Sequence, residues 1–160
     1  MIRFAINIDG IATVDAAAAR FNASMADFRP AWPAIVADFY QVEAAQFDSL
    51  GAAGGTGWAP LSAKYAQWKE KHFPGKPILE QSGKLRRSLT EAGAERAIAR
   101  KGMKQLTLGS SSRLAQWAQA GTGREPARPV MELGADFEQR CREQIAQYLI
   151  AAGREAGFGV

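Results

Sequence analysis

Along the first fifty residues, the pattern of apolar and polar positions predicts one strand followed by two helices. Residues 4–8 alternate between apolar and other side chains, which is typical of a half-buried strand. Apolar residues over 14–28 recur at steps of three and four, the spacing of an amphipathic helix. A second stripe of this kind covers 35–47, and Pro33 precedes it at a position that suits the first turn of a helix.

The remainder of the chain alternates short helices with short strands. Ser62 is a suitable N-cap, because its hydroxyl can accept a hydrogen bond from the backbone of a first helical turn. From there the pattern predicts, in order, a helix to Lys71, a helical turn over 84–89, a hairpin over 95–108 with Gly102 in its turn, a helix over 113–119, a strand over 130–133 and a final helix over 134–152.

These elements predict a single α+β domain. A chain of 160 residues fits one domain, and strands and helices in separate runs are typical of the α+β class. We expect a small antiparallel or mixed sheet, packed by the N-terminal helices and by the long C-terminal helix. Residues 1–50 would supply the N-terminal strand and helices, 58–133 the central part, and 134–152 the C-terminal helix, with a flexible connector at 51–57.

Composition argues against several classes of function. No run of roughly 18 apolar residues is present, so we expect no membrane-spanning helix and a cytosol-like compartment. The chain has one cysteine, Cys141, and one histidine, His72. An internal disulfide is therefore excluded, and no spacing indicates a cysteine-based metal site or a nucleophile with its general base. The sequence predicts neither an enzyme nor a cofactor.

Positive charge is concentrated in the middle of the chain. Between Lys64 and Lys104 there are eleven Lys and Arg residues against four acidic residues. Such a surplus attracts acidic proteins or nucleic acid, although a solvated surface has the same composition. One hypothesis is therefore a nucleic-acid-binding module that combines basic side chains with stacking aromatic rings. The basic residues it would use are Lys84, Arg86, Arg87, Arg96, Arg100 and Lys101.

Apolar anchors, glycine and proline concentrate between Trp58 and Pro129, and three blocks there match a known family. In order, the blocks contain Trp58, Pro60, Leu61 and Lys69; Ile78, Leu79, Ser82, Gly83, Leu85 and Ser88; and Ala115, Gln119, Gly121 and Pro126 to Pro129. On these blocks the chain resembles the phage virion morphogenesis, or tail completion, proteins of tailed bacteriophages. The third block departs from the family's pattern, because Leu114 and Ala118 stand where Tyr and His are common.

The resemblance implies a structural protein of phage tail completion and head–tail joining, at the neck or the head-proximal end of the tail. Proteins of this family typically assemble as rings, often hexameric, and catalyse nothing. The implied partners are further copies of the chain, the tail tube and head–neck proteins, with transient contact to DNA in the channel. No membrane and no cofactor is implied. The implied location is the virion, and the host cytoplasm during assembly.

The same region supplies the candidate interface residues. They are apolar anchors, loop-shaping glycines and prolines, and polar side chains placed to reach a neighbour: Trp58, Pro60, Leu61, Lys69, Leu79, Gly83, Leu85, Arg86, Ser88, Trp117, Gly121, Pro126, Arg128 and Pro129. Arg128 follows Ala127 on a loop that two prolines stiffen. Two roles are open for it. Its guanidinium either holds a carboxylate of a neighbouring subunit by two hydrogen bonds or ties down its own loop.

Overall fold

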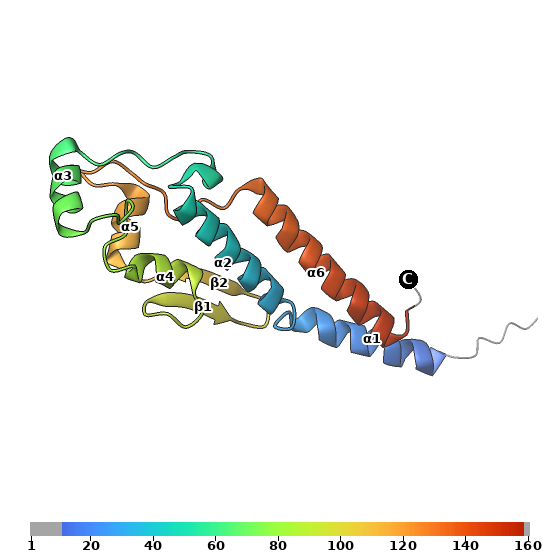
Figure 1. Cartoon of the computed structure of the whole chain (residues 1–160). Helices are drawn as coiled ribbons and strands as arrows, with labels where there is room; N and C mark the ends of the chain where they lie inside the picture. Colours follow the sequence, from blue (N-terminus) through green and yellow to red (C-terminus); the bar gives the residue numbers. More distant parts are fainter. Residues whose placement is uncertain (1–10, 159–160) are drawn as a thin grey trace, which may run out of the picture.

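The computed structural model describes residues 11–158, and within them the chain is mostly helical with one two-stranded antiparallel sheet. The elements are, in order, α1 (Ile11–Ala26), α2 (Trp32–Asp48), the short 3-10 turn η1 (Ala52–Gly54), α3 (Ala63–His72), α4 (Lys84–Thr90), β1 (Ala97–Lys101), β2 (Leu106–Ser110), α5 (Arg113–Ala120) and α6 (Ala135–Ala156). Figure 1 shows an elongated molecule with α3 at one end and α1 at the other. The predicted α+β class with a long C-terminal helix is confirmed.

The two N-terminal helices form where the periodicity predicts them, but they are buried to different extents. α2 begins next to Pro33 and turns Phe39 and Phe47 into the core. α1 packs along α6 and has no comparable contact with the other described helices and strands, and Val14 is 59% exposed. A helix that packs against a single neighbour buries only part of its apolar face, and the remaining apolar side chains stay exposed. The strand predicted over residues 4–8 lies outside the described residues.

Two hydrophobic clusters hold the elements together. The larger consists of Phe39, Phe47, Trp58, Leu85, Leu89, Ala115, Ala118 and Val130. The smaller consists of Ala31, Trp32 and Ile35, with partly buried side chains of α6 against them. Burial of apolar surface is the main force that favours folding. The larger cluster therefore joins α2 to the central part of the chain, and the smaller one joins the start of α2 to α6.

The hairpin predicted over 95–108 forms between β1 and β2. Ala99 pairs with Leu108 in an antiparallel register. Gly102 lies in the turn, as predicted, and its carbonyl oxygen accepts a hydrogen bond of 2.7 Å from Nε1 of Trp32. Because that indole belongs to the first turn of α2, the tip of the hairpin is held against the N-terminal half of the molecule.

The strand predicted over 130–133 is wrong, because one side chain of α5 takes the place of a neighbouring strand. The Gln119 Oε1 atom accepts hydrogen bonds from the backbone N–H groups of Val130 and Met131, each at 3.0 Å. Its Nε2 atom donates to the carbonyl oxygen of Met131, also at 3.0 Å. Buried backbone groups need partners, but a side-chain amide can supply them as well as a sheet. The apolar residues of this segment indicated burial and not strand pairing.

The final helix predicted over 134–152 forms and continues to Ala156. Gly153 lies inside it, facing α1, where a Cβ would meet the ring of Phe21 at an ordinary contact distance of 3.7 Å. The Tyr148 hydroxyl donates a hydrogen bond of 2.7 Å to the carbonyl oxygen of Asp27, just after α1. The helix therefore continues past its predicted end at residue 152, because packing against α1 stabilises it.

Candidate functional site

Three helices and a loop enclose a groove at the α3 end of the molecule. The groove has a volume of about 580 Å³ and lies between α3, α4, α5 and the loop 121–128. Its walls come from segments that are up to 67 residues apart in the chain, since Leu61 and Arg128 both line it. Each of the three sequence blocks contributes to it.

Eight of the fourteen candidate interface residues line this groove, and the other six lie behind or beside it. The lining residues are Leu61, Lys69, Leu79, Gly83, Leu85, Trp117, Pro126 and Arg128. The six others are Trp58, Pro60, Arg86, Ser88, Gly121 and Pro129. Tertiary structure thus brings most of the sequence-predicted residues to one surface.

Arg128 ties the loop of the third block to the segment of the first. It is 5% exposed. Its Nε atom donates to the carbonyl oxygen of Ala59 at 2.7 Å, and a terminal nitrogen donates to that of Pro60 at 3.0 Å. The other terminal nitrogen pairs with Glu125 at 3.3 Å. Of the two roles open for Arg128, the structure shows the intrachain one, which fixes the shape of one wall of the groove.

Trp58 and Pro129 form a second tie between the same two segments. The Trp58 indole is buried, and its Nε1 atom donates to the carbonyl oxygen of Pro129 at 2.7 Å. Its ring packs edge-on against Phe47 of α2, with 5.2 Å between centroids. Gly51 has a φ of +91°, and a Cβ there would overlap the indole ring. The groove is therefore anchored to the main core through Trp58.

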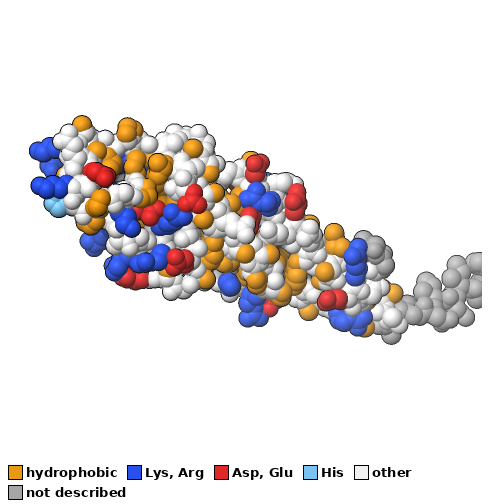
Figure 2. All heavy atoms as spheres, viewed as in Figure 1, with side chains coloured by type: hydrophobic (Ala, Val, Ile, Leu, Met, Phe, Trp, Pro, Cys, Tyr) orange, Lys and Arg blue, Asp and Glu red, His pale blue; other side chains and the backbone are white. Residues whose placement is uncertain are grey.

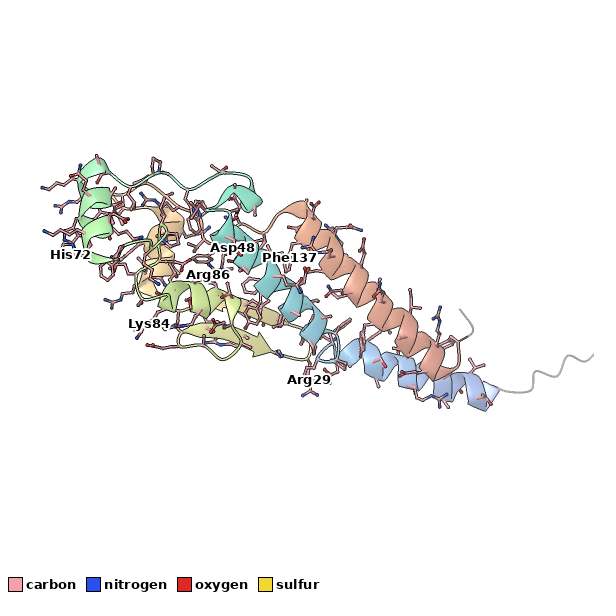
Figure 3. All side chains as sticks on the ribbon, viewed as in Figure 1. Arg29, Asp48, His72, Lys84, Arg86 and Phe137 are labelled. Carbon is pink, nitrogen blue, oxygen red and sulfur yellow. The ribbon has the colours of Figure 1, made fainter. Side chains whose placement is uncertain are left out.

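Ser88 and Arg86 brace α4 from its other faces. The buried Ser88 hydroxyl is 2.8 Å from that of Ser110 at the end of β2. Arg86 is half-buried between Asp48 and Glu80, with nitrogen–oxygen distances of 2.5 Å and 3.1 Å. Figure 3 shows Arg86 and Asp48 pointing toward one another from α4 and α2. The two carboxylates raise the pKa of the Arg86 guanidinium, chiefly by hydrogen bonding.

Two lining residues other than glycine have backbones in the left-handed region. Leu79 has a φ of +63° and Arg96 a φ of +70°. L-residues with side chains rarely adopt this region, and such residues concentrate at functional sites because the surrounding structure must hold them there. Gly121, beside the groove, has a φ of +71°, and a Cβ there would lie 2.8 Å from the backbone nitrogen of Ala127. The left-handed backbone of Leu79 and Arg96 costs free energy, which the packing of the groove walls must offset.

The groove is positively charged at its floor and at its rim. Lys69 is 5% exposed, and its Nζ atom donates a hydrogen bond to the carbonyl oxygen of Pro77. Burial lowers the pKa of this ammonium, and the nearby Glu80 partly opposes that effect. Lys84 and Arg96 also line the groove, while Glu125 is the acidic residue of its lining. This arrangement favours a negatively charged occupant.

Large apolar side chains stand exposed at the rim. Trp117 is 56% exposed and Leu114 is 45% exposed, both from α5, and Tyr65 of α3 is partly exposed as well. Tyr65 stacks on Trp68, as their spacing predicts, with ring centroids 5.5 Å apart. Exposed aromatic and leucine side chains grouped around a concave surface are typical of protein contact sites.

His72 and Cys141 lie away from the groove lining. The imidazole ends α3, stacks on Trp68 with 4.5 Å between centroids, and is exposed (Figure 3). The thiol is half-buried in the smaller hydrophobic cluster, and burial raises its pKa, which makes the reactive thiolate scarcer. Within residues 11–158, no group of three His, Cys, Asp or Glu side chains is close enough to hold a metal ion.

The comparison with known protein families agrees with the resemblance of the three blocks. The phage virion morphogenesis family matches residues 9–150. The chain belongs to this family. No curated protein and no solved structure matches the chain. A phage virion morphogenesis protein is a structural component of the virion, so membership implies a structural part in virion assembly and not a catalytic one.

The family assignment also implies that other virion proteins are partners of this protein. Among the described residues, no helix is both long enough and apolar enough to cross a membrane. Of the six residues proposed for a nucleic-acid module, three are ion-paired within the chain, namely Lys84, Arg86 and Arg96. Their charge is therefore partly neutralised before any ligand arrives.

Sequence reasoning did not identify several of the groove residues. Leu114 lines it but belongs to no candidate set. Lys84 and Arg96 also line it, although the sequence assigned them to the nucleic-acid module and not to the subunit interface. A signal existed for Leu114, because it stands three positions before Trp117 and three-residue spacing puts two helical side chains on one face. No local signal indicated the burial of Lys69, since charged residues are almost never fully buried. The same holds for Glu43 of α2, which is fully buried outside the groove.

Proposed function

We propose that this phage virion morphogenesis protein acts in tail completion and head–tail joining, as a subunit of a hexameric ring at the neck or the head-proximal end of the tail. The observation that carries the proposal is the groove at the α3 end, where residues of all three blocks meet beneath exposed apolar side chains of α5. A surface of this kind suits contact with another protein subunit. Its tail-tube and head–neck partners would bind the finished ring.

The bracing of the groove supports an assembly role. Arg128 and Trp58 hold two distant segments by hydrogen bonds to backbone carbonyl oxygens, so the walls keep their shape before a partner arrives. Binding to a preorganised surface loses less conformational entropy than binding to a mobile one. A subunit that must repeat the same contact around a ring benefits from such rigidity.

The test combines light scattering after size-exclusion chromatography with electron microscopy of the purified protein. We expect rings of one diameter that contain six copies, either alone or after addition of tails that lack this protein. Trp117→Ala should reduce assembly, because it removes the most exposed aromatic side chain of the rim. A strict monomer under all these conditions would rule the proposal out.

The alternative function is a nucleic-acid-binding module, and the same purified protein can be tested for it. A mobility-shift assay with duplex DNA, repeated over a range of salt concentrations, separates the two. Tight binding at physiological salt that falls steeply as salt rises would favour the module. Weak binding of the free subunit agrees with a ring that touches DNA only in its channel.

A further inference from the structure

We propose that the groove of one copy receives the acidic corner of the next copy, an inference that rests on the ring proposed above. We define the acidic corner as residues 132–138, at the start of α6. It contains Glu132, Asp136 and Glu138 and no Lys or Arg. Leu133 within it is 36% exposed, and Asp136 is exposed as well. Glu138 pairs with Arg142 of its own helix at 3.3 Å, and Glu132 is half-buried. The corner therefore presents the Leu133 side chain beside the exposed carboxylate of Asp136.

The groove has the complementary chemistry. Lys69 has three N–H donors, and within the described residues its ammonium has one hydrogen-bond partner, the carbonyl oxygen of Pro77. At the rim, Lys84 and Arg96 share a single carboxylate, that of Glu95, at 3.0 Å and 3.6 Å. Two cations are thus balanced by one anion. A carboxylate brought to this surface would give the unused donors a charged acceptor.

The two surfaces point in different directions, because α5 separates them. Trp117 and Ala118 face the groove, whereas Gln119 holds the backbone that leads into the acidic corner. In a helix with 3.6 residues per turn, the side chains of Trp117 and Gln119 lie roughly 160° apart around the axis. A copy cannot fill its own groove with its own corner. The contact must be made with another copy.

A contact between two different surfaces of identical chains is head-to-tail, and such contacts close into rings when the rotation between neighbours permits. Figure 2 shows many Lys and Arg side chains at the α3 end, with acidic ones among them, and both acidic and basic side chains near the start of α6. In the contact that we propose, Leu133 of one copy packs against Leu114 and Trp117 of the next. Asp136 lies near Lys84 of that copy.

Site-directed cross-linking tests the contact directly. In a Cys141→Ala background, one preparation carries Leu114→Cys and a second carries Leu133→Cys. The two are mixed and treated with a short thiol-to-thiol cross-linker. We expect a covalent dimer from the mixture, and a ladder of multimers from a chain with both substitutions. In the matched control, the second preparation carries Val14→Cys instead of Leu133→Cys. Val14 is more exposed than Leu133, but it lies on α1 at the other end of the molecule.

Charge reversal tests the same contact without a covalent bond. Lys84→Glu and Asp136→Lys should each weaken self-association about tenfold or more, measured by analytical ultracentrifugation, because each puts like charges together. The double variant should regain most of the wild-type affinity. Lys101→Glu, an exposed residue of β1 outside the groove, is the control for the change in net charge.

The outcomes separate this inference from the proposed function. If rings form but neither the Leu114–Leu133 cross-link nor rescue in the double variant is seen, the proposed contact is wrong and the proposed ring still stands. If Lys84→Glu abolishes head–tail joining but leaves ring formation unchanged, the groove binds a different virion protein. That result would also overturn the proposed contact. Failure of every preparation to self-associate would overturn both.

Discussion

Two buried polar side chains, Arg128 and Glu43, differ in whether the fold satisfies them. The Arg128 guanidinium donates to two backbone carbonyl oxygens and pairs with Glu125. Glu43 of α2 is fully buried, and among residues 11–158 neither of its carboxylate oxygens has a hydrogen-bond partner. A satisfied buried group helps to specify one conformation, whereas an unsatisfied one costs free energy. Substitution should therefore have opposite effects at the two positions.

Arg128→Ala should lower the free energy of unfolding by about 2–4 kcal/mol, because it leaves the carbonyl oxygens of Ala59 and Pro60 without their donors. Arg128→Lys should lose part of this amount, since one ammonium cannot reproduce the planar fork. Urea unfolding measures both. Arg124→Ala, an exposed arginine of the same loop, serves as control. Equal losses for Arg128→Ala and Arg124→Ala would contradict the bracing role.

Glu43→Gln should change how stability depends on pH. Burial raises the pKa of Glu43 from 4.5 to about 8. Below pH 4.5 the carboxyl is protonated in both states; between these values it ionises in the unfolded state alone, which favours unfolding as pH rises. Relative to Glu43→Gln, the wild-type free energy of unfolding should fall over this window by up to about 1.4 kcal/mol per pH unit, and then level off.

Urea titrations from pH 4 to pH 9 measure this difference, with Glu143→Gln as a control because Glu143 lies exposed on α6. The Glu43→Gln variant should be the more stable protein at pH 8 and should lose its advantage at pH 4. Parallel pH profiles for the wild type and Glu43→Gln would show that the folded protein pairs this carboxylate after all.

At the scale of the element, two glycines with different surroundings should respond oppositely to alanine. Gly153 has helical geometry and room for a Cβ, so Gly153→Ala should stabilise α6 by about 0.5–1 kcal/mol through the entropy of the unfolded chain. Gly51 has a φ of +91° and abuts the Trp58 ring, so Gly51→Ala should destabilise. Thermal unfolding measures both shifts. A lower melting temperature for Gly153→Ala would mean that α1 and α6 approach more closely than the structure shows.

The backbone of Val130 and Met131 is held by the Gln119 side chain, and Gln119→Ala tests that contact. The substitution removes the partner of two backbone N–H groups and of the Met131 carbonyl oxygen. We expect the free energy of unfolding to drop by about 1–3 kcal/mol. Hydrogen exchange should accelerate at Val130 and Met131. Gln116→Ala on the same helix is the matched control, and equal exchange rates in the two variants would count against this account.

At the scale of the whole molecule, the uneven charge layout predicts that self-association weakens with salt. A surplus of basic residues at the α3 end faces an acidic corner of the neighbour in the proposed contact. Raising salt from about 50 mM to about 500 mM shortens the range over which such charges attract. Sedimentation equilibrium should therefore show a higher dissociation constant at high salt. Association that strengthens with salt would indicate a contact held by apolar burial alone.

Local features were predictable because their causes are local. The Ser62 cap of α3 rests on one hydroxyl near one backbone N–H, with the Ser62 side chain accepting from Tyr65 as capping geometry requires. The hairpin around Gly102 and the helical spacing of α5 are of the same kind. The failures have a shared origin as well. Each of the two wrong predictions concerns a segment that another element stabilises. Gln119 of α5 holds residues 130 and 131 without a strand, and Phe21 of α1 packs against the helix beyond residue 152.

The sequence by itself determined the helices, the hairpin and the family, because periodicity, caps and short blocks act over a few residues. Tertiary structure alone decided that eight candidate residues share one groove and that Lys69 and Glu43 are buried. It also decided that the Arg128 guanidinium forms hydrogen bonds within its own chain. Contacts between residues dozens of positions apart are set by how helices pack, and no local pattern records them.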